Sequence, residues 1–339
     1  MAVTDTSLLA AAREGDQAAF DALIGPRRRE LHAHCYRMLG SAHDADDALQ
    51  ESLLRAWRAL PAFEGRSSLR SWLYRIATNV SLTQIEARPR RALPVDLGPA
   101  ADADGGWADH LNEGIWLGPY DGVAPQEQAE AREDLELAFV AALQHLPPNE
   151  RVALLMREVL GFSAQEVADA MATSVAAVNS ALQRARKGLD DRLPDTTQRA
   201  TLRTLGDERQ QELVRRYTRA LEEADVDGLL DLLTEDATWS MPPSPDWFRG
   251  RDGIRTFLLA GPLQHRWRHR PITVNGQLAT ACWIWDADRG EYVGWVVDVL
   301  DVEPDGRISN VTAFIDDRLF ARLGLPATLP ADTPATPTG

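Results

Sequence analysis

The sequence predicts a multidomain chain in which two all-α units are followed by one α+β unit. Three observations predict this architecture. Apolar residues recur at helical spacing throughout residues 7–87 and again over residues 129–193. An acidic stretch rich in Pro and Gly separates these two segments. From about residue 205 the helical pattern gives way to short strand-like runs bounded by turn dipeptides.

The bulk composition indicates a folded protein without a membrane span or a secretion signal. Hydrophobic residues make up 44% of the chain, which is enough to build cores. No apolar run approaches the roughly 18–20 residues that a membrane helix needs, and the first residues lack the pattern of a signal peptide. Cys35 and Cys282 lie far apart, without metal-ligand spacing. We therefore expect a cytoplasmic protein that uses no membrane, metal or cofactor.

The charge distribution restricts how the chain can bind DNA. A formal net charge of -15 argues at first against a nucleic-acid partner. Residues 92–128 contribute seven acids and no Lys or Arg, whereas basic residues gather locally at 27–29, between 66 and 91, and at 184–187. Such a chain is expected to bind free DNA weakly. A partner with its own DNA-binding surface would remove this difficulty.

The first unit, residues 7–87, is predicted to contain four helices. Gly40 ends the second helix and Pro61 ends the third. The third helix opens at Ser41–Asp47, whose acids suit a helix N-terminus. Residues 63–68 form a loop by their Gly and Ser content, and Ser67 or Ser68 caps the fourth helix.

Residues 88–128 are predicted to be an acidic, partly extended linker. Its aromatic side chains, Trp107, Trp116 and Tyr120, would be costly to leave in water. We therefore expect Trp116 and Tyr120 to pack on the second or the C-terminal domain.

Residues 162–189, within the second unit at 129–193, predict a helix-turn-helix. Ser163 caps one helix, a turn follows at 171–173, and Ser174 caps a second helix with an apolar inner face. Ala172 stands where such turns favour Gly, at a cost of about 1–2 kcal/mol in the left-handed conformation. The outer face presents groups suited to base edges and phosphates: Asn179, Ser180, Gln183, Arg184 and Lys187. An ordinary helical hairpin with a polar outer face is the alternative.

Residues 205–322 predict an α+β domain. Two helices precede a strand at 237–241 and a short helix at 251–260. Four strand-like runs then follow, at about 266–274, 278–286, 291–302 and 307–315, separated by turn signals such as Asn275-Gly276. The Pro/Thr/Ala-rich tail, residues 326–339, is predicted to be disordered.

Large aromatic residues predict a pocket or a docking surface in this third domain. Six of the ten tryptophans lie after residue 238. The candidate pocket residues are Trp239, Met241, Trp247, His265, Trp283, Trp285, Trp295 and Asp298. Apolar neighbours in the strand would raise the pKa of Asp298 and suit it to acid–base catalysis. Its alternation with Trp295 and Val297 equally permits a solvent-facing side chain, so we favour ligand or domain docking over catalysis.

The motifs in the first two units resemble those of a known family. The strings DADDALQE from Asp44, LLRAW from Leu53, FEGRSS from Phe63 and LRSWLYRIATN from Leu69 closely resemble the second region of extracytoplasmic-function sigma factors. The helix-turn-helix resembles their fourth region, in the same order. This resemblance implies that Asp46, Asp47, Gln50 and Glu51 grip the clamp helices of core RNA polymerase. A merely solvated helix start is the alternative.

The same resemblance implies promoter binding by the loop at 63–68 and the helix after it. Opening a promoter requires capture of unpaired bases, by stacking and a basic groove. The candidate DNA-binding residues are Arg66, Ser67, Arg70, Tyr74 and Arg75. We expect Arg70 and Tyr74 nearer the exposed face, and Trp72 in the core with Leu69 and Ile76.

The third domain resembles the SnoaL-like polyketide-cyclase fold, a cone-shaped α+β barrel, on three strings: TEDATW from Thr234, RGRDGI from Arg249 and NVTAFID from Asn310. Fold does not imply activity, and a small-molecule ligand is a candidate partner. GIWLGPY from Gly114 resembles a linker motif of sigma factors that carry this domain. The resemblance implies that the domain docks on the DNA-binding half and regulates it in cis.

The sequence is therefore identified as a sigma factor, not an enzyme. The first unit is expected to melt and recognise the minus-ten element, and the helix-turn-helix to recognise the minus-thirty-five element. Two alternatives remain open. An isomerase, cyclase or hydrolase fused to a DNA-binding regulator would need a buried carboxylate in a closed pocket. A repressor using only the helix-turn-helix would leave the acidic helix without a role and would bind duplex DNA without polymerase.

Overall fold

The computed structural model describes residues 3–101, 115–120, 135–190 and 192–336. The chain forms two compact units. The helical unit comprises residues 1–91 and 124–193, so it contains both segments that the sequence predicted as all-α. The sheet unit comprises residues 92–123 and 194–339, so it contains most of the linker as well as the α+β domain.

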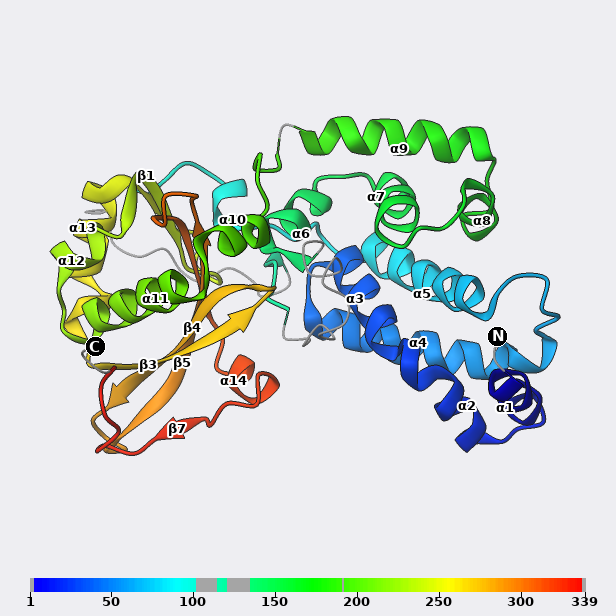
Figure 1. Cartoon of the computed structure of the whole chain (residues 1–339), viewed down its shortest axis with the longest axis horizontal. Coiled ribbons are helices and arrows are strands. Elements are labelled where there is room, and N and C mark those ends of the chain that lie inside the picture. Colours follow the sequence, from blue (N-terminus) through cyan, green and yellow to red (C-terminus); the bar gives the residue numbers. More distant parts are fainter. Residues whose placement is uncertain (1–2, 102–114, 121–134, 191, 337–339) are drawn as a thin grey trace. The chain divides into compact units, whose positions relative to one another are not determined.

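The first part of the helical unit consists of α1 (Val3–Arg13), α2 (Gln17–Ile24), α3 (Arg28–Leu39), α4 (Ala42–Ala59) and α5 (Leu69–Glu86), coloured blue to cyan in Figure 1. The first of the four predicted helices is in fact two, α1 and α2, because the chain turns at residues 14–16. The predicted boundary at Gly40 and Ser41 is confirmed. Gly40 ends α3 with φ 69°, and the Ser41 hydroxyl accepts from Asp44 N at 3.2 Å to cap α4. Of the two candidate caps for α5, Ser68 is used, since its hydroxyl accepts from Ser71 N at 3.0 Å.

The core of this part confirms the expectation for Trp72. Its side chain is buried, and its ring lies 4.9 Å from the ring of Phe63 at the start of the loop. The inner faces of α3 and α5 meet through the same core, where His34 Nε2 lies 2.9 Å from the Thr78 hydroxyl. The loop at 64–68 is consequently anchored at its start while its remaining residues stay exposed.

The second part of the helical unit contains α6 (Leu137–Gln144), α7 (Pro148–Leu154), α8 (Ala164–Ala170) and α9 (Val175–Asp190). A π-helical turn, Leu155–Val159, continues α7. Ser163 and Glu166 form a capping box at α8, with Ser163 N donating to Glu166 Oε2 at 2.9 Å. Ala172 adopts φ 51° in the turn before α9. The helix-turn-helix therefore forms with Ala in the left-handed position, as the sequence predicted.

The sheet unit begins with α10 (Gln198–Leu205), α11 (Asp207–Glu222) and α12 (Val226–Leu230). Its strands are β1 (Leu233–Ser240), β2 (Trp247–Arg249), β3 (Trp267–Val274), β4 (Gln277–Asp286), β5 (Glu291–Val302), β6 (Ile308–Ile315) and β7 (Thr328–Leu329). Two further helices are α13 (Gly250–Ala260) and α14 (Arg318–Arg322). The strand order is β2-β1-β6-β5-β4-β3, and β7 pairs with β5. Only the β1–β6 pairing is parallel among the strands described. The predicted α+β architecture is confirmed.

Helices α11 and α13 pack on this sheet and close its core. The ring of Tyr217 from α11 stacks 6.2 Å from that of Trp239 in β1, and Phe257 from α13 stacks 4.5 Å from Phe248. Large apolar side chains therefore fill the space between helices and sheet.

The disorder predicted for the tail is wrong for residues 326–336. Strand β7 pairs with β5, and Trp283 Nε1 donates to Pro326 O at 3.0 Å. Further along, Arg268 Nε donates to Thr333 O at 2.7 Å and Thr336 N donates to Glu222 Oε2 at 2.7 Å. The composition of the tail could not reveal this order, because the partners lie in the folded sheet. Residues 337–339 lie outside the described residues.

The described parts of the linker fold onto the sheet unit. Ala92 N donates to Ile115 O at 2.9 Å, and Trp247 Nε1 donates to Gly98 O at 2.9 Å. Tyr120 N donates to Asn275 Oδ1 at 2.7 Å in the turn between β3 and β4. Trp116 and Tyr120 are both buried, so packing of Tyr120 on the C-terminal domain is confirmed. Trp107 lies outside the described residues.

None of the helices within the described ranges has the length and apolar character that crossing a membrane requires.

Candidate functional site

An acidic ridge runs along the outer face of α4. The ridge is formed by the residues predicted for polymerase binding: Asp46, Asp47, Gln50 and Glu51. The side chains of Asp46 and Asp47 are about half exposed, at 54% and 53%. Glu51 Oε1 accepts from Arg55 Nε at 2.6 Å, one helical turn along. The ridge therefore presents several carboxylates to a partner on one helical face.

Leu54 adds an exposed apolar side chain to this ridge, which the sequence analysis did not single out. Its side chain is 44% exposed, and it stands seven residues after Asp47 and four after Gln50, so it shares their face. Large apolar side chains exposed beside polar ones are typical of docking surfaces. The helical spacing carried the signal, because Leu54 falls outside the stripe of apolar residues that α4 buries.

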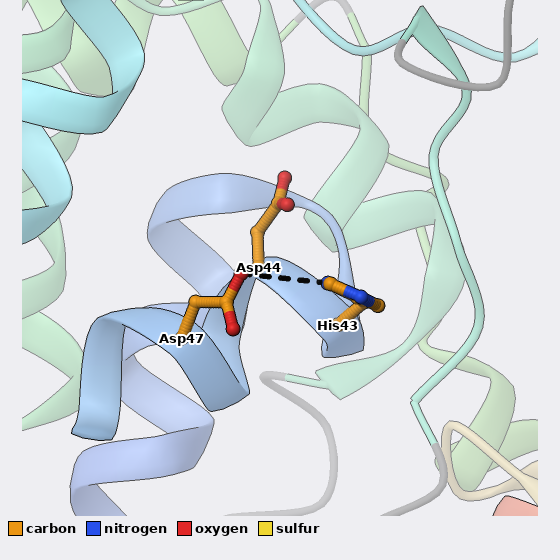
Figure 2. A group of neighbouring side chains, drawn as sticks. All are labelled: His43, Asp44 and Asp47. Atoms are coloured by element: carbon orange, nitrogen blue, oxygen red, sulfur yellow. Dashed lines mark ion pairs between the residues drawn. The ribbon is translucent and has the colours of Figure 1, made fainter. Parts of the chain in front are cut away.

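At the start of α4, His43, Asp44 and Asp47 lie close enough together for a metal ion. Figure 2 shows the Asp44 carboxylate pointing away from the other two side chains, and it forms salt bridges with Arg88 and Arg91 instead. Burial by itself would raise the pKa of Asp44, but the hydrogen bonds and charges of these arginines outweigh it and lower the pKa. The carboxylate is thus committed to arginine partners, and the group gives no support to a metal site.

The loop before α5 offers exposed polar groups. Arg66 is highly exposed and its Nε lies 2.7 Å from Glu64 Oε2, and Ser67 and Arg75 are also exposed. Surface ion pairs of this kind contribute little stability, so Arg66 is free to exchange Glu64 for a phosphate. These three residues lie where DNA could reach them.

Arg70 and Tyr74 lie against the second part of the helical unit instead. The Arg70 guanidinium sits 5.1 Å from the Tyr74 ring and 4.5 Å from the Phe162 ring, and it donates to Leu160 O at 3.2 Å. Tyr74 is 1% exposed, and burial together with the charge of Glu30 raises its pKa. The expected exposure of Tyr74 is therefore wrong in this arrangement, because the segment before α8 packs over it.

A polar contact also joins α5 to α8. The Ser71 hydroxyl donates to Glu166 Oε1 at 2.7 Å. The Ser163 backbone N–H and the Ser71 hydroxyl lower the pKa of Glu166, so the carboxylate is held in its charged form. We call these contacts of Arg70, Ser71 and Tyr74 with Leu160, Phe162 and Glu166 the seam.

Helix α9 separates its two faces as the sequence predicted. Val178, Leu182, Ala185 and Leu189 are buried. The exposed face carries all five candidates for DNA contact: Asn179, Ser180, Gln183, Arg184 and Lys187. Arg184 Nε donates to Glu150 Oε1 at 2.6 Å, so one of the five is held by a salt bridge. Their contacts with DNA stay a prediction.

The candidate pocket residues of the sheet unit are not brought together. Trp239 and Met241 belong to the core between helices and sheet, whereas the buried Trp283 packs against Phe320. His265 is exposed and Trp295 is 45% exposed. Trp247 and Trp285 are partly buried. The aromatic residues therefore serve several different contacts rather than one cavity wall.

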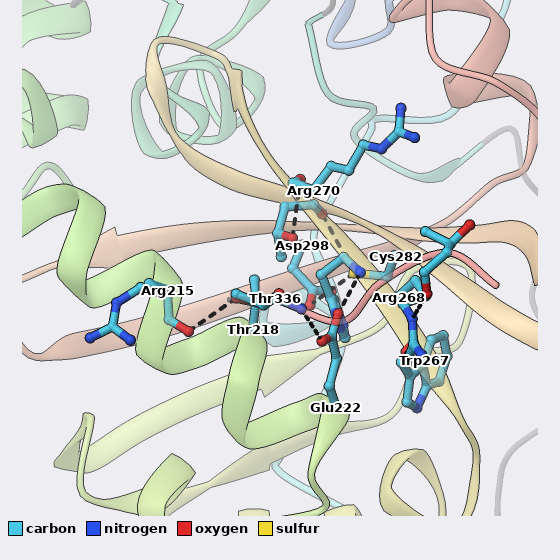
Figure 3. Close-up of polar contacts among 12 residues, drawn as sticks. Arg215, Thr218, Glu222, Trp267, Arg268, Arg270, Cys282, Asp298 and Thr336 are labelled. Atoms are coloured by element: carbon cyan, nitrogen blue, oxygen red, sulfur yellow. Dashed lines mark hydrogen bonds and ion pairs between the residues drawn. The ribbon is translucent and has the colours of Figure 1, made fainter. Parts of the chain in front are cut away.

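Asp298 faces the interior, which rules out the solvent-facing alternative. Its Oδ2 accepts from the Tyr217 hydroxyl at 2.8 Å and lies 3.5 Å from Cys282 Sγ. Figure 3 labels Asp298 and Cys282 and also shows Thr336 of the tail, whose backbone N donates to Glu222 Oε2 at 2.7 Å. Burial raises the pKa of Asp298, and the hydrogen bond from Tyr217 opposes the shift without cancelling it. The raised pKa was expected from the sequence, but the carboxylate is satisfied by neighbouring side chains.

This burial predicts a pH-dependent stability of the sheet unit. A carboxyl whose folded pKa lies above its unfolded value, about 3.9 for Asp, destabilises the fold increasingly as pH rises between the two values. Replacement of Asp298 by Asn keeps an acceptor for Tyr217 without the charge. We expect Asp298→Asn to raise the melting temperature at pH 8 and to lose this advantage near pH 4. Calorimetry at both pH values checks this, with exposed Asp288→Asn as control. A lower melting temperature at pH 8 would contradict it.

Comparison with known proteins identifies the family. Residues 23–91 match Sigma-70 region 2, residues 136–189 match Sigma-70 region 4, and residues 214–311 match a SnoaL-like domain. The ECF RNA polymerase sigma factor SigG of Mycobacterium tuberculosis is 45% identical to the chain over 326 residues, which are 94% of this chain and 86% of that protein. The chain belongs to the ECF RNA polymerase sigma factors. It is a transcription regulator, not an enzyme, and the SnoaL-like domain is an added module.

Other relatives agree with this assignment. The RNA polymerase sigma-H factor of Pseudomonas aeruginosa is 33% identical over 189 residues, which are 56% of this chain and 93% of that protein. The crystal structure of the extracytoplasmic function sigma factor SigJ of M. tuberculosis has the same fold, with a TM-score of 0.57 at 22% identity over 88% of this chain and 97% of that chain. Sigma factors bind core RNA polymerase and promoter DNA, so the exposed faces of α4 and α9 are candidate sites for these two partners.

Proposed function

We propose that this sigma factor binds core RNA polymerase through the acidic ridge of α4 and Leu54. We also propose that α9 recognises the upstream promoter element. Arg66 and Ser67 of the loop before α5, together with Arg75 of α5, would bind the melted downstream element. The protein then acts wherever the polymerase is, which is the cytoplasm. The exposure of these residues supports the assignment, because their internal contacts are salt bridges at the surface rather than buried packing.

Leu54 provides a test of the polymerase surface. A partly exposed apolar residue within a charged ridge becomes fully buried in a complex, and truncation of such residues typically costs more than about 1 kcal/mol of binding. We expect Leu54→Ala to weaken binding to core polymerase about tenfold without lowering the stability of the free protein. Fluorescence anisotropy with purified core enzyme measures the affinity. Leu97→Ala, at another exposed leucine, is the control, and equal affinities for both variants would contradict the assignment.

We further propose that the compact helical unit is a resting form that must open at the seam. The observation that carries this proposal is the covering of Arg70 and Tyr74, both candidates for DNA contact, by Leu160 and Phe162. Recognition of two promoter elements by one chain also requires the two parts of the unit to separate along the DNA. In the resting form, the candidate DNA-binding residues Arg70 and Tyr74 stay covered until core polymerase binds.

A cleavable cross-link across the seam tests this. Cysteines introduced by Ser71→Cys and Glu166→Cys can be joined by a short thiol-cleavable reagent. Because the native Cys35 and Cys282 are buried, the reagent should react with the introduced pair. We expect the linked protein to lose at least 90% of promoter-dependent initiation with core polymerase, and to regain it after cleavage. The Ser71→Cys single variant, treated identically, is the control. Full initiation by the linked protein would refute an obligatory opening.

We propose that the SnoaL-like domain regulates initiation in cis through the linker. The bonds from Gly98 and Tyr120 to Trp247 and Asn275 support this, since they hold the chain between regions 2 and 4 against the sheet. While the linker is bound to the sheet, it restrains regions 2 and 4, which must move apart on the promoter. A small-molecule ligand of this domain stays a prediction, and the scattered positions of its candidate residues favour a docking role.

Transcription by the full chain beside Asn275→Ala tests the role of the linker. Asn275 accepts from Tyr120 N, and its own N donates to Tyr120 O at 3.3 Å; the substitution removes the side-chain bond. We expect initiation to rise at least threefold, because the linker is released more easily. A truncation ending near residue 195 lacks the SnoaL-like domain, so its initiation rate gives the upper limit expected for a fully released linker. Unchanged initiation by both proteins would show that the domain does not act through the linker.

A further inference from the structure

A cavity of about 310 Å³ lies inside the helical unit, between the end of α5 and the segment joining α6 to α7. Region 2 contributes Asp44, Arg88, Arg90 and Arg91 to its lining. Region 4 contributes His145 and Arg151. Four arginines therefore surround one small space, and they come from both sigma regions.

Two of the arginines that line this cavity have no carboxylate partner among the described residues. Arg88 and Arg91 both form salt bridges with Asp44, which is nearly buried. Arg90 Nη1 lies 3.0 Å from His145 Nδ1, a neutral partner at best. Within the described ranges, no salt bridge joins Arg90 or Arg151 to a carboxylate. Among the residues that the structure describes, Asp44 is the one carboxylate in the lining of this cavity, and it pairs with Arg88 and Arg91 rather than with Arg90 or Arg151.

Arg151 is the buried one of these two arginines, and its described hydrogen-bond acceptors are all neutral. It is 3% exposed and donates to neutral acceptors: Gln144 Oε1 at 2.7 Å, Gln144 O at 3.1 Å, Leu146 O at 3.3 Å and Met38 O. Its buried Nε has no acceptor among the described residues. Burial and the nearby charge of Arg90 lower the pKa of Arg151 to about 10. A buried charge without a counter-ion is costly, and an anion between Arg90 and Arg151 would remove that cost.

We propose that this cavity binds a small polyanion of the diphosphate class, held between Arg90 of region 2 and Arg151 of region 4. The volume lies at the lower end of the range for ligand pockets, which favours one small molecule over a peptide or nucleic-acid chain. Guanidinium groups bind phosphate oxygens in pairs, with matched planar geometry. Arg90 is exposed and can bind the oxygens of one phosphate in this way. The terminal nitrogens of Arg151 stay on Gln144, Leu146 and Met38, so Arg151 offers the second phosphate its charge and its Nε–H.

Such a ligand would have a defined effect on the protein. Because its contacts come from both sigma regions, it binds the compact form and loses half of its contacts when the regions separate. Binding therefore favours the compact form over the open one. This site is independent of the seam and of the SnoaL-like domain, and it would make the sigma factor responsive to a small phosphorylated metabolite.

Calorimetric titration of the full-length protein with inorganic pyrophosphate, at constant ionic strength, tests the site. We expect Arg90→Ala to weaken binding at least tenfold; Arg90 is exposed, so the fold should tolerate the change. Asp44→Asn removes the one described carboxylate of the cavity and is expected to tighten binding, an effect that structural damage would not produce. Arg58→Ala, an exposed arginine on α4 outside the cavity, is the control and should bind like the wild type.

Parallel titrations with a nucleoside diphosphate, inorganic phosphate and sulfate identify the source of the ligand. Tighter binding of the nucleoside diphosphate than of pyrophosphate assigns the site to a nucleotide, and equal binding assigns it to the diphosphate group itself. Weak binding of all four anions, unchanged in Arg90→Ala, would mean an adventitious ion only and would overturn the proposal. Equal pyrophosphate affinity of Asp44→Asn and the wild type would also count against it.

Discussion

Replacement of Trp283 by Ala is expected to lower the free energy of unfolding of the sheet unit by about 3–5 kcal/mol, the usual cost of removing a buried Trp. Trp283 is fully buried, and its ring meets the Phe320 ring edge-on at 5.0 Å. Its partner in the β4–β5 register is Gly294, where an added Cβ would lie 2.7 Å from the Phe320 ring. The three residues therefore pack as one contact, and removal of the indole leaves a cavity that Gly294 cannot fill.

The same substitution removes the donor to Pro326 O, so the tail and β7 should become less protected. Hydrogen exchange of peptides from β4, β5 and residues 326–336 reports this unit separately from the helical one. Trp295→Ala is a matched control, because that tryptophan lies in β5 with 45% of its surface exposed. A loss of less than about 1 kcal/mol for Trp283→Ala, or equal losses for the two variants, would show that the packing is misassigned.

Substitutions on α9 are expected to relax promoter choice. Each lost base contact costs about 1–3 kcal/mol, which corresponds to about 5- to 150-fold in affinity. Asn179→Ala and Arg184→Ala should weaken binding of the reconstituted holoenzyme to its best promoter and bring the affinities of upstream-element variants closer together. Binding should be measured on a promoter series that changes one upstream base at a time. The stability of the free protein should hardly change, since both side chains are exposed.

Asp190→Ala, at the exposed end of α9, is the control for this series. Glu150→Gln gives a second comparison, because it frees Arg184 from its salt bridge without altering α9. If Asn179→Ala and Arg184→Ala both keep the wild-type ranking of promoters, α9 recognises its target with other residues.

Local signals made much of the helical unit predictable. Ser41, Ser68 and Ser163 are helix caps in the sequence and in the structure, because capping depends on residues within one turn. The helix-turn-helix was equally local: a capping box, a short turn and an apolar stripe define it, and Ala172 takes the left-handed conformation despite its cost. The four ridge residues of α4 came instead from the resemblance to sigma factors, and the structure places them on the outer face of α4.

Contacts between distant segments were not predictable from periodicity. Tyr74 occupies a position that the α5 pattern left near the surface, and Phe162, far along the chain, buries it. The tail has the composition of a disordered segment, yet the β5 backbone and Trp283 give it partners. The count of tryptophans indicated a pocket or a docking surface, but strand register and a bulge between Cys282 and Trp283 distribute them over different contacts.

The attachment of the linker to the sheet also bears on promoter architecture. A chain can span at most about 3.3–3.6 Å per residue, and residues fixed against β2 and the β3–β4 turn add little to that reach. The distance that regions 2 and 4 can bridge therefore depends on how much of the linker is unbound. A sigma factor with its linker attached should tolerate only short spacers between the two promoter elements, and its release should extend the range of spacer lengths that the holoenzyme accepts.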